Sequence, residues 1–145
     1  MAHEYVLMAP KGFDMPLLPN TRDSSLLCAD LKALSNMRFV IMKKGRQLRV
    51  MQDRIFQDHG FCPNVILETD NWQTSLRMVE NGVALTILPN DTNNMVFTQL
   101  QFDKYALEKE YRRRTFLCYR KNAYLSRLLS DFILTSHRVF KGAEL

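Results

Sequence analysis

The chain has 145 residues, 46% of them hydrophobic and 24% charged, which suits one globular domain or a large piece of one. No apolar run approaches the roughly 20 residues that span a bilayer. The start, Met1-Ala2-His3-Glu4, lacks the pattern of a secretory signal peptide. We therefore expect a cytoplasmic protein without a membrane partner, whose sequence begins as if truncated.

The amino-terminal part of the sequence predicts two buried strands. Glu4–Pro10 is apolar and ends at a proline, and Arg38–Met42 is rich in apolar and β-branched residues. Between them, Lys11–Ser25 contains glycine, prolines and asparagine and is predicted to be a loop. A short helical turn is expected over Ala29–Leu34.

The central part alternates between helix and strand. A periodic apolar face predicts a helix over about Gln47–His59, stopped by Gly60. A second helix is expected to be capped by Asp70 and to end at Asn81-Gly82. The strands that alternate with these helices are Asn64–Glu68 and Val83–Leu88.

The carboxyl-terminal part is predicted to end in a long helix. Asn90–Asn94 is a polar loop, Met95–Phe102 is extended, and Arg114–Arg120 forms a strand. Asn122 is expected to cap a helix over about Ala123–Phe140, which carries a broad apolar stripe. Lys141 and Gly142 provide the usual signals of a helix end.

Strands that alternate with helices imply parallel strands joined by right-handed crossovers. The predicted fold class is therefore α/β, with a mostly parallel sheet flanked by helices.

The net charge of +5 comes from two local groups of basic residues. One group contains Lys43, Lys44, Arg46 and Arg49, and the other is Arg112–Arg114. Neither group is interleaved with aromatic residues, as a groove for single-stranded nucleic acid would be. The pattern favours a moderately basic surface over nucleic-acid binding.

The three cysteines, Cys28, Cys62 and Cys118, are odd in number, and none lies in a Cys-x-x-Cys pair. This argues against a disulfide framework or a zinc site, and free thiols fit a reducing cytoplasm. We expect neither a metal nor a cofactor.

No catalytic motif stands out, and we expect the chain not to be an enzyme. His59 precedes Cys62 by three residues, but a Cys–His nucleophile also needs an orienting group and an oxyanion site, for which there is no signal. Glu68 and Asp70 resemble paired carboxylates, but helix capping accounts for Asp70. A helix-turn-helix over Arg49–Ile66 is disfavoured because a proline and β-branched residues predict a strand in its second half.

A ligand site is predicted where two strands end. Ligands of parallel α/β sheets bind beyond the carboxyl ends of the strands, and helix N-termini there favour anions. The candidates are Lys43, Lys44 and Gly45 after one strand and Thr69, Asp70 and Asn71 after the next. Solvated turn residues and ordinary helix-start chemistry account for these residues equally well.

The same region resembles the effector domains of LysR-type transcriptional regulators. The shared pattern has a glycine-aromatic-x-proline entry, a strand ending in an acidic and a hydroxyl residue, a helix closing on valine-x-x-glycine, and a strand ending in leucine-proline. Here these elements are Gly60-Phe61-Cys62-Pro63, Glu68-Thr69, Val79-Glu80-Asn81-Gly82 and Leu88-Pro89.

The resemblance spans nearly the whole chain and implies a fold like one subdomain of a type 2 periplasmic binding protein, in which two subdomains clasp a small molecule. It implies that residues of about 10–100 form the second-subdomain core and that about 103–145 form a returning strand and helix. It also implies a partial effector-binding domain, a small-molecule effector, a homo-oligomer, and DNA contact only through a domain absent from this chain.

This sequence departs from the family pattern in two places. Gly82-Val83-Ala84 stands where the family has glycine-x-glycine, and lysines replace the serine-rich loop after Met42, which puts the usual hydroxyl contacts in doubt. Two alternatives remain at this point: a solute-binding protein of the same fold, and a small α/β enzyme with an unrecognised site.

Overall fold

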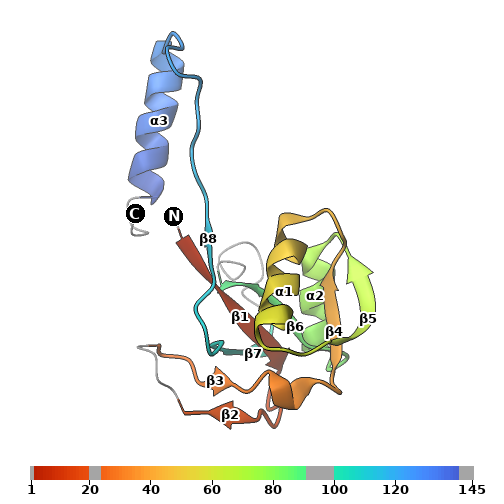
Figure 1. Cartoon of the computed structure of the whole chain (residues 1–145). Helices are drawn as coiled ribbons and strands as arrows, with labels where there is room; N and C mark the ends of the chain where they lie inside the picture. Colours follow the sequence, from red (N-terminus) through yellow and green to blue (C-terminus); the bar gives the residue numbers. More distant parts are fainter. Residues whose placement is uncertain (1, 20–23, 91–99, 141–145) are drawn as a thin grey trace.

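The strand β1 (Ala2–Pro10) forms the spine of the molecule in the computed structural model, which describes residues 2–19, 24–90 and 100–140 (Figure 1). Its residues Tyr5–Ala9 are buried, as their continuous apolar run predicts. β1 pairs antiparallel with β6 (Thr86–Pro89), β7 (Phe102–Tyr105) and β8 (Arg112–Arg114). The predicted strand Glu4–Pro10 is confirmed and begins two residues earlier than expected.

The parallel part of the sheet lies on the other side of β6. β4 (Arg38–Met42) and β5 (Asn64–Thr69) pair in parallel and are joined by the helix α1 (Gln47–Asp58). α2 (Trp72–Glu80) then leads to β6, and a parallel bridge between Phe39 and Leu85 sets the start of β6 beside β4. The α/β fold class is confirmed, while the antiparallel setting of β1 was not evident from the pattern.

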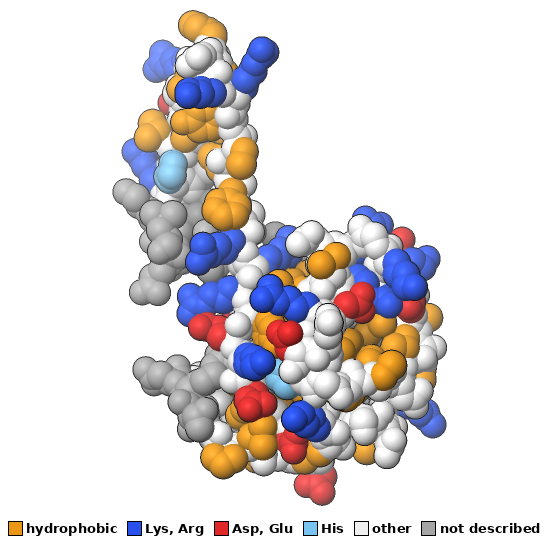
Figure 2. Space-filling view, in the orientation of Figure 1, with side chains coloured by type: hydrophobic (Ala, Val, Ile, Leu, Met, Phe, Trp, Pro, Cys, Tyr) orange, Lys and Arg blue, Asp and Glu red, His pale blue; other side chains and the backbone are white. Residues whose placement is uncertain are grey.

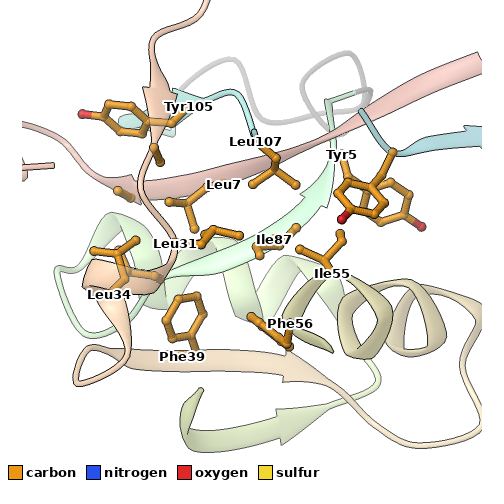
Figure 3. Packing of buried hydrophobic residues seen from close by; sticks show 14 of the residues in the cluster. Tyr5, Leu7, Leu31, Leu34, Phe39, Ile55, Phe56, Ile87, Tyr105 and Leu107 are labelled. Atoms are coloured by element: carbon orange, nitrogen blue, oxygen red, sulfur yellow. The ribbon is translucent and has the colours of Figure 1, made fainter. Parts of the chain in front are cut away.

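Side chains from the two faces of the sheet form two hydrophobic clusters. Tyr5, Leu7 and Ala9 of β1 pack in one cluster with Ile55 and Phe56 of α1. Figure 3 shows this cluster, in which Phe39 and Ile87 also lie between the sheet and α1. Alternate residues of β1, Val6 and Met8, pack in the other cluster with Leu76 and Val79 of α2. Because successive residues of β1 point to opposite sides, α1 and α2 pack against opposite faces of the sheet.

Two short strands cover one end of the first cluster. β2 (Leu17–Leu18) and β3 (Cys28–Ala29) form an antiparallel pair, followed by a single 3-10 turn, η1 (Lys32–Leu34). The turn predicted over Ala29–Leu34 is confirmed in its second half. The segment predicted as the loop Lys11–Ser25 contains β2, and its residues 20–23 lie outside the described part.

The strand predicted over Val83–Leu88 begins later, at Thr86. Val83 donates its backbone N–H to Met78 O, and Gly82 donates to Val79 O, which closes the last turn of α2. Val83 therefore belongs to the end of α2, although its β-branched side chain predicted a strand. Residues 91–99 of the predictions for Asn90–Asn94 and Met95–Phe102 lie outside the described part. Of the last three residues of the second prediction, only Phe102 is in a strand, as the first residue of β7.

The strand predicted over Arg114–Arg120 was wrong beyond its first residue. The observed strand β8 is three exposed arginines, Arg112–Arg114, and residues 115–120 form no strand. Phe116 and Leu117, two apolar residues of the predicted strand, are exposed.

The prediction that Asn122 caps the last helix was also wrong. α3 begins at Arg127 (Arg127–Phe140), and Asn122 has a φ of 64°, a left-handed conformation that asparagine tolerates in turns. Ser126 takes the capping role, because its Oγ accepts the N–H of Leu129 at 3.3 Å. The predicted ending at Lys141 and Gly142 lies outside the described residues.

α3 stands apart from the rounded body at the end of an extended segment (Figure 1). Its apolar side chains line the projecting helix in Figure 2, and Leu128, Phe132, Leu134 and Val139 are all more than half exposed. None of the helices in the described ranges is long and apolar enough to cross a bilayer.

Candidate functional site

The carboxyl ends of β4 and β5 are directly adjacent. Met42 lies opposite Thr69 in the parallel register, and the N–H of Lys43 donates to Thr69 O at 2.8 Å. The turns that follow the two strands therefore begin side by side, and the structure brings the two halves of the predicted site together.

The turn after β4 leads into α1 with an open helix start. Gly45 has a φ of 87°, in the region that glycine adopts at no steric cost. Arg46 is the N-cap residue in extended conformation, and no side-chain hydrogen bond caps the helix. The side chains of Lys43 and Lys44 are exposed, and neither forms an ion pair with a described residue. Positive charge and uncapped backbone N–H groups thus occur together here.

The turn after β5 is organised by its own side chains. Thr69 Oγ1 accepts the N–H of Asn71 at 3.1 Å, and Asn71 Oδ1 accepts the N–H of Gln73 at 2.9 Å. Asn71, not Asp70, therefore caps α2, so the predicted capping role of Asp70 was wrong by one residue. Asp70 instead pairs with Arg46 across the two turns, at 3.6 Å between Nη2 and Oδ2.

Arg49 on α1 contacts the carboxyl ends of both β4 and β5. Its Nη1 donates to Met42 O at 2.9 Å and lies 2.9 Å from Glu68 Oε1, and its Nε donates to Asp53 Oδ1 at 2.7 Å. Burial lowers the pKa of Arg49, but the hydrogen bonds and charges of Asp53 and Glu68 outweigh burial and raise the pKa overall. The guanidinium is therefore a permanent, buried positive charge.

Gln52, one turn further along α1, is completely buried. Its Oε1 accepts the N–H of Met42, and its Nε2 donates to Ile87 O, each at 2.8 Å. Sequence reasoning missed Arg49 and Gln52. A signal was present, because Gln52 falls on the stripe of Leu48 and Ile55, where a polar residue must find buried partners.

Two hollows lie at the opposite end of the sheet. One, of about 520 Å³, is lined by polar residues that include Lys11, Glu80 and Gln101. The other, of about 250 Å³, lies beside the first residues of β4 and is lined by Phe13, Arg38 and Leu85 among others. Neither contains a residue of the predicted site.

The predicted site thus offers exposed cations, an open helix start and a capped helix start at one sheet edge. Within residues 2–19, 24–90 and 100–140, no cluster of three or more His, Cys, Asp or Glu side chains is placed to hold a metal ion.

Solved structures with the same fold include an effector-binding domain and a regulatory domain. The effector-binding domain of QuiR, solved with shikimate, matches 99% of this chain at a TM-score of 0.71 and 18% identity. The regulatory domain of CcmR from Synechocystis PCC6803, solved with 2-PG, matches 99% at a TM-score of 0.69 and 17% identity. The chain covers only 64% and 65% of those two chains.

Sequence comparison points the same way. Two HTH-type transcriptional regulators of Bacillus subtilis strain 168, both named as uncharacterized, match shorter stretches of the chain. YybE is 32% identical over 60 residues, 41% of this chain and 20% of its own length. YcgK is 29% identical over 63 residues, 43% of this chain and 19% of its own length. The model of the LysR substrate-binding domain matches residues 3–141. This chain belongs to the LysR substrate-binding domain family.

Proposed function

We propose that the chain is the ligand-sensing part of a bacterial LysR-type transcriptional regulator, and that it binds a small organic anion to modulate transcription. The observation that carries the proposal is the hydrogen bond from Lys43 N–H to Thr69 O, which sets two helix starts side by side. Family membership and the small molecules named with QuiR and CcmR support a small-molecule effector. A ligand that prefers one conformation would shift the regulator toward it.

Each residue of the proposed site has a distinct role. Lys43 and Lys44 supply positive charge, and Gly45 allows the backbone to approach an anionic group closely. Thr69 and Asn71 offer a hydroxyl and an amide. Asp70 contributes through its pair with Arg46, which cancels its charge next to the ligand.

We further propose that this chain works as part of a larger assembly. Residues of about 10–100 form the core of the second subdomain, and about 103–145 return to a first subdomain outside this chain. The exposed apolar side chains of α3 support that arrangement, because helices of soluble proteins bury such a face against a partner. On its own, the chain covers this face by self-association, and DNA is contacted only by a separate domain. The protein acts in the cytoplasm as a binder, not as an enzyme.

Thermal unfolding with and without an anion tests the proposed site. We take 2-phosphoglycolate and shikimate as probes, because they are the two anions in the solved structures of CcmR and QuiR. Ligands that bind the native state raise its melting temperature. We expect both probes to stabilise the chain and the double variant Lys43→Gln/Lys44→Gln to lose most of that stabilisation.

The matched control is Lys32→Gln/Lys109→Gln, which removes two exposed lysines away from the strand ends. It leaves the response to both probes unchanged if the site is correct. If both double variants lose the same amount of the stabilisation by the probes, that stabilisation comes from general charge attraction and the proposed site is refuted.

A further inference from the structure

The strands β4 and β6 separate at their carboxyl ends, and side chains fill the gap between them. Val40 N–H donates to Leu85 O at 3.0 Å, as in a regular parallel ladder. Two residues further on, the ladder would join Met42 N–H to Ile87 O. The amide of Gln52 lies between these two groups instead and bonds to each at 2.8 Å.

A second side chain shows the same separation. Thr86 Oγ1 donates to Val40 O at 2.8 Å, where a regular ladder would use a backbone N–H of β6. Both side chains are completely buried. Buried side chains therefore bond to three of the backbone groups that the opening exposes, namely Met42 N–H, Ile87 O and Val40 O.

Arg49 holds the other side of the same strand end. Gln52 occupies the N–H of Met42 and Arg49 occupies its carbonyl, so α1 controls both backbone groups of the residue that precedes the lysine turn. Arg49 also reaches across to Glu68 on β5. Because Arg49 and Gln52 are three residues apart on one helix, they lie on the same face and act together.

The position of Arg49 also affects the charge at the strand ends. The Glu68 side chain is 40% exposed beside Thr69, so its carboxylate would repel an anion at the strand ends. The buried guanidinium of Arg49 offsets that negative charge. With Asp70 paired to Arg46, Lys43 and Lys44 then determine the sign of the potential at the site.

We propose that Arg49 and Gln52 are positioning residues of the effector site, a step that rests on the function proposed above. Gln52 keeps the sheet open at Met42 and so fixes where the lysine turn begins. Arg49 fixes the same turn and offsets Glu68, so that the site selects anions by their charge.

Binding of 2-phosphoglycolate and shikimate by Arg49→Met and by Arg49→Met/Glu68→Gln tests the charge role. 2-Phosphoglycolate carries more negative charge than shikimate. Arg49→Met should lower the affinity for 2-phosphoglycolate about tenfold and the affinity for shikimate by clearly less. The reason is that the Glu68 carboxylate, without its ion pair to Arg49, repels the more highly charged anion more strongly. Adding Glu68→Gln should restore most of the lost affinity. Equal weakening of both anions, or no recovery with Glu68→Gln, would overturn this role.

Amide hydrogen exchange without any ligand tests the positioning role independently. Gln52→Leu should accelerate exchange of the Met42 amide about thirtyfold or more relative to Val40, because Met42 loses its acceptor. Gln52→Glu keeps an acceptor for Met42 and should preserve most of its protection. Gln47→Leu, an exposed site on the same helix, is the control. Unchanged protection of Met42 in Gln52→Leu would overturn the positioning role.

The two measurements separate the possible failures. If neither probe binds the unmodified chain while the Met42 amide responds to Gln52→Leu, the proposed anion site fails and the positioning of the strand end stands. If the probes bind and all variants match the unmodified chain, the anion site stands and the positioning role fails.

Discussion

The backbone N–H of Lys43 donates to the carbonyl oxygen of Thr69 at 2.8 Å, which joins the first residue beyond β4 to the last residue of β5. This bond extends the parallel ladder by one rung past Met42. The two turns and the two helix starts that follow are thus held together by backbone geometry.

Gly45→Ala tests whether Gly45 is needed only for its positive φ or also for ligand binding. Gly45 and Gly60 both have positive φ, and a Cβ added at either meets no atom within 4 Å. Each alanine variant should therefore lose about 1 kcal/mol of stability from backbone strain alone. We expect only Gly45→Ala to weaken binding of 2-phosphoglycolate, measured by calorimetry. Equal affinity in the two variants would remove Gly45 from the site.

Asn71→Ala and Asp70→Ala distinguish the observed cap of α2 from the predicted one. Asn71 Oδ1 accepts the N–H of Gln73, whereas Asp70 forms an exposed ion pair with Arg46. Asn71→Ala should cost about 1 kcal/mol in urea unfolding, and Asp70→Ala at most about 0.5 kcal/mol. The reverse order would mean that Asp70 caps the helix in solution.

Tyr111 links the segment before β8 to the end of α1. Its hydroxyl donates to Asp58 Oδ2 at 2.9 Å, and its carbonyl accepts the N–H of Tyr5. Burial, followed by the hydrogen bond to Asp58, raises the pKa of Tyr111 to about 12.

Alkaline unfolding tests this environment. The folded pKa of Tyr111 lies above the unfolded value near 10, so its contribution is complete below pH 10 and is lost as pH rises through 12. The unmodified chain should lose up to about 2 kcal/mol more stability over this range than Tyr111→Phe. Parallel stability curves for the two proteins would show that the Tyr111 pKa is not raised.

The apolar face of α3 predicts concentration-dependent association of the isolated chain. Leu128 and Phe132 are 81% and 57% exposed on the projecting helix. Leu128→Glu/Phe132→Glu should shift the chain toward monomer in sedimentation velocity, because burial of this face drives association. Val50→Glu, at a residue of α1 that is 59% exposed, is the control and should not change the distribution. Identical sedimentation of all three proteins would argue against association through α3.

The central βαβα part could be predicted from the sequence because its signals are local. The apolar run Arg38–Met42, the helix stop at Gly60 and the apolar run after Pro63 each act within one turn or strand. The alternation of strands and helices predicted that Met42 and Glu68 end adjacent parallel strands. β4 and β5 do pair in parallel, and Met42 lies opposite Thr69, one residue beyond Glu68.

The carboxyl-terminal part could not be predicted because its partners are not local. Phe116 and Tyr119 are of residue types that favour strands, but no neighbouring strand in the described part of the chain pairs with them. Asn122 and Ser126 are both good caps, and only the backbone conformation decides between them. Gln52 was missed for a related reason, since its two partners are 10 and 35 residues away.

Amide chemical-shift mapping tests the central claim most directly. Titration of the ¹⁵N-labelled chain with 2-phosphoglycolate should move the amides of Lys43, Lys44, Gly45, Thr69 and Asn71 together, with one common dissociation constant. Shifts centred on Lys11, Gly82 and Gln101, which line the hollow at the other end of the sheet, would contradict the account.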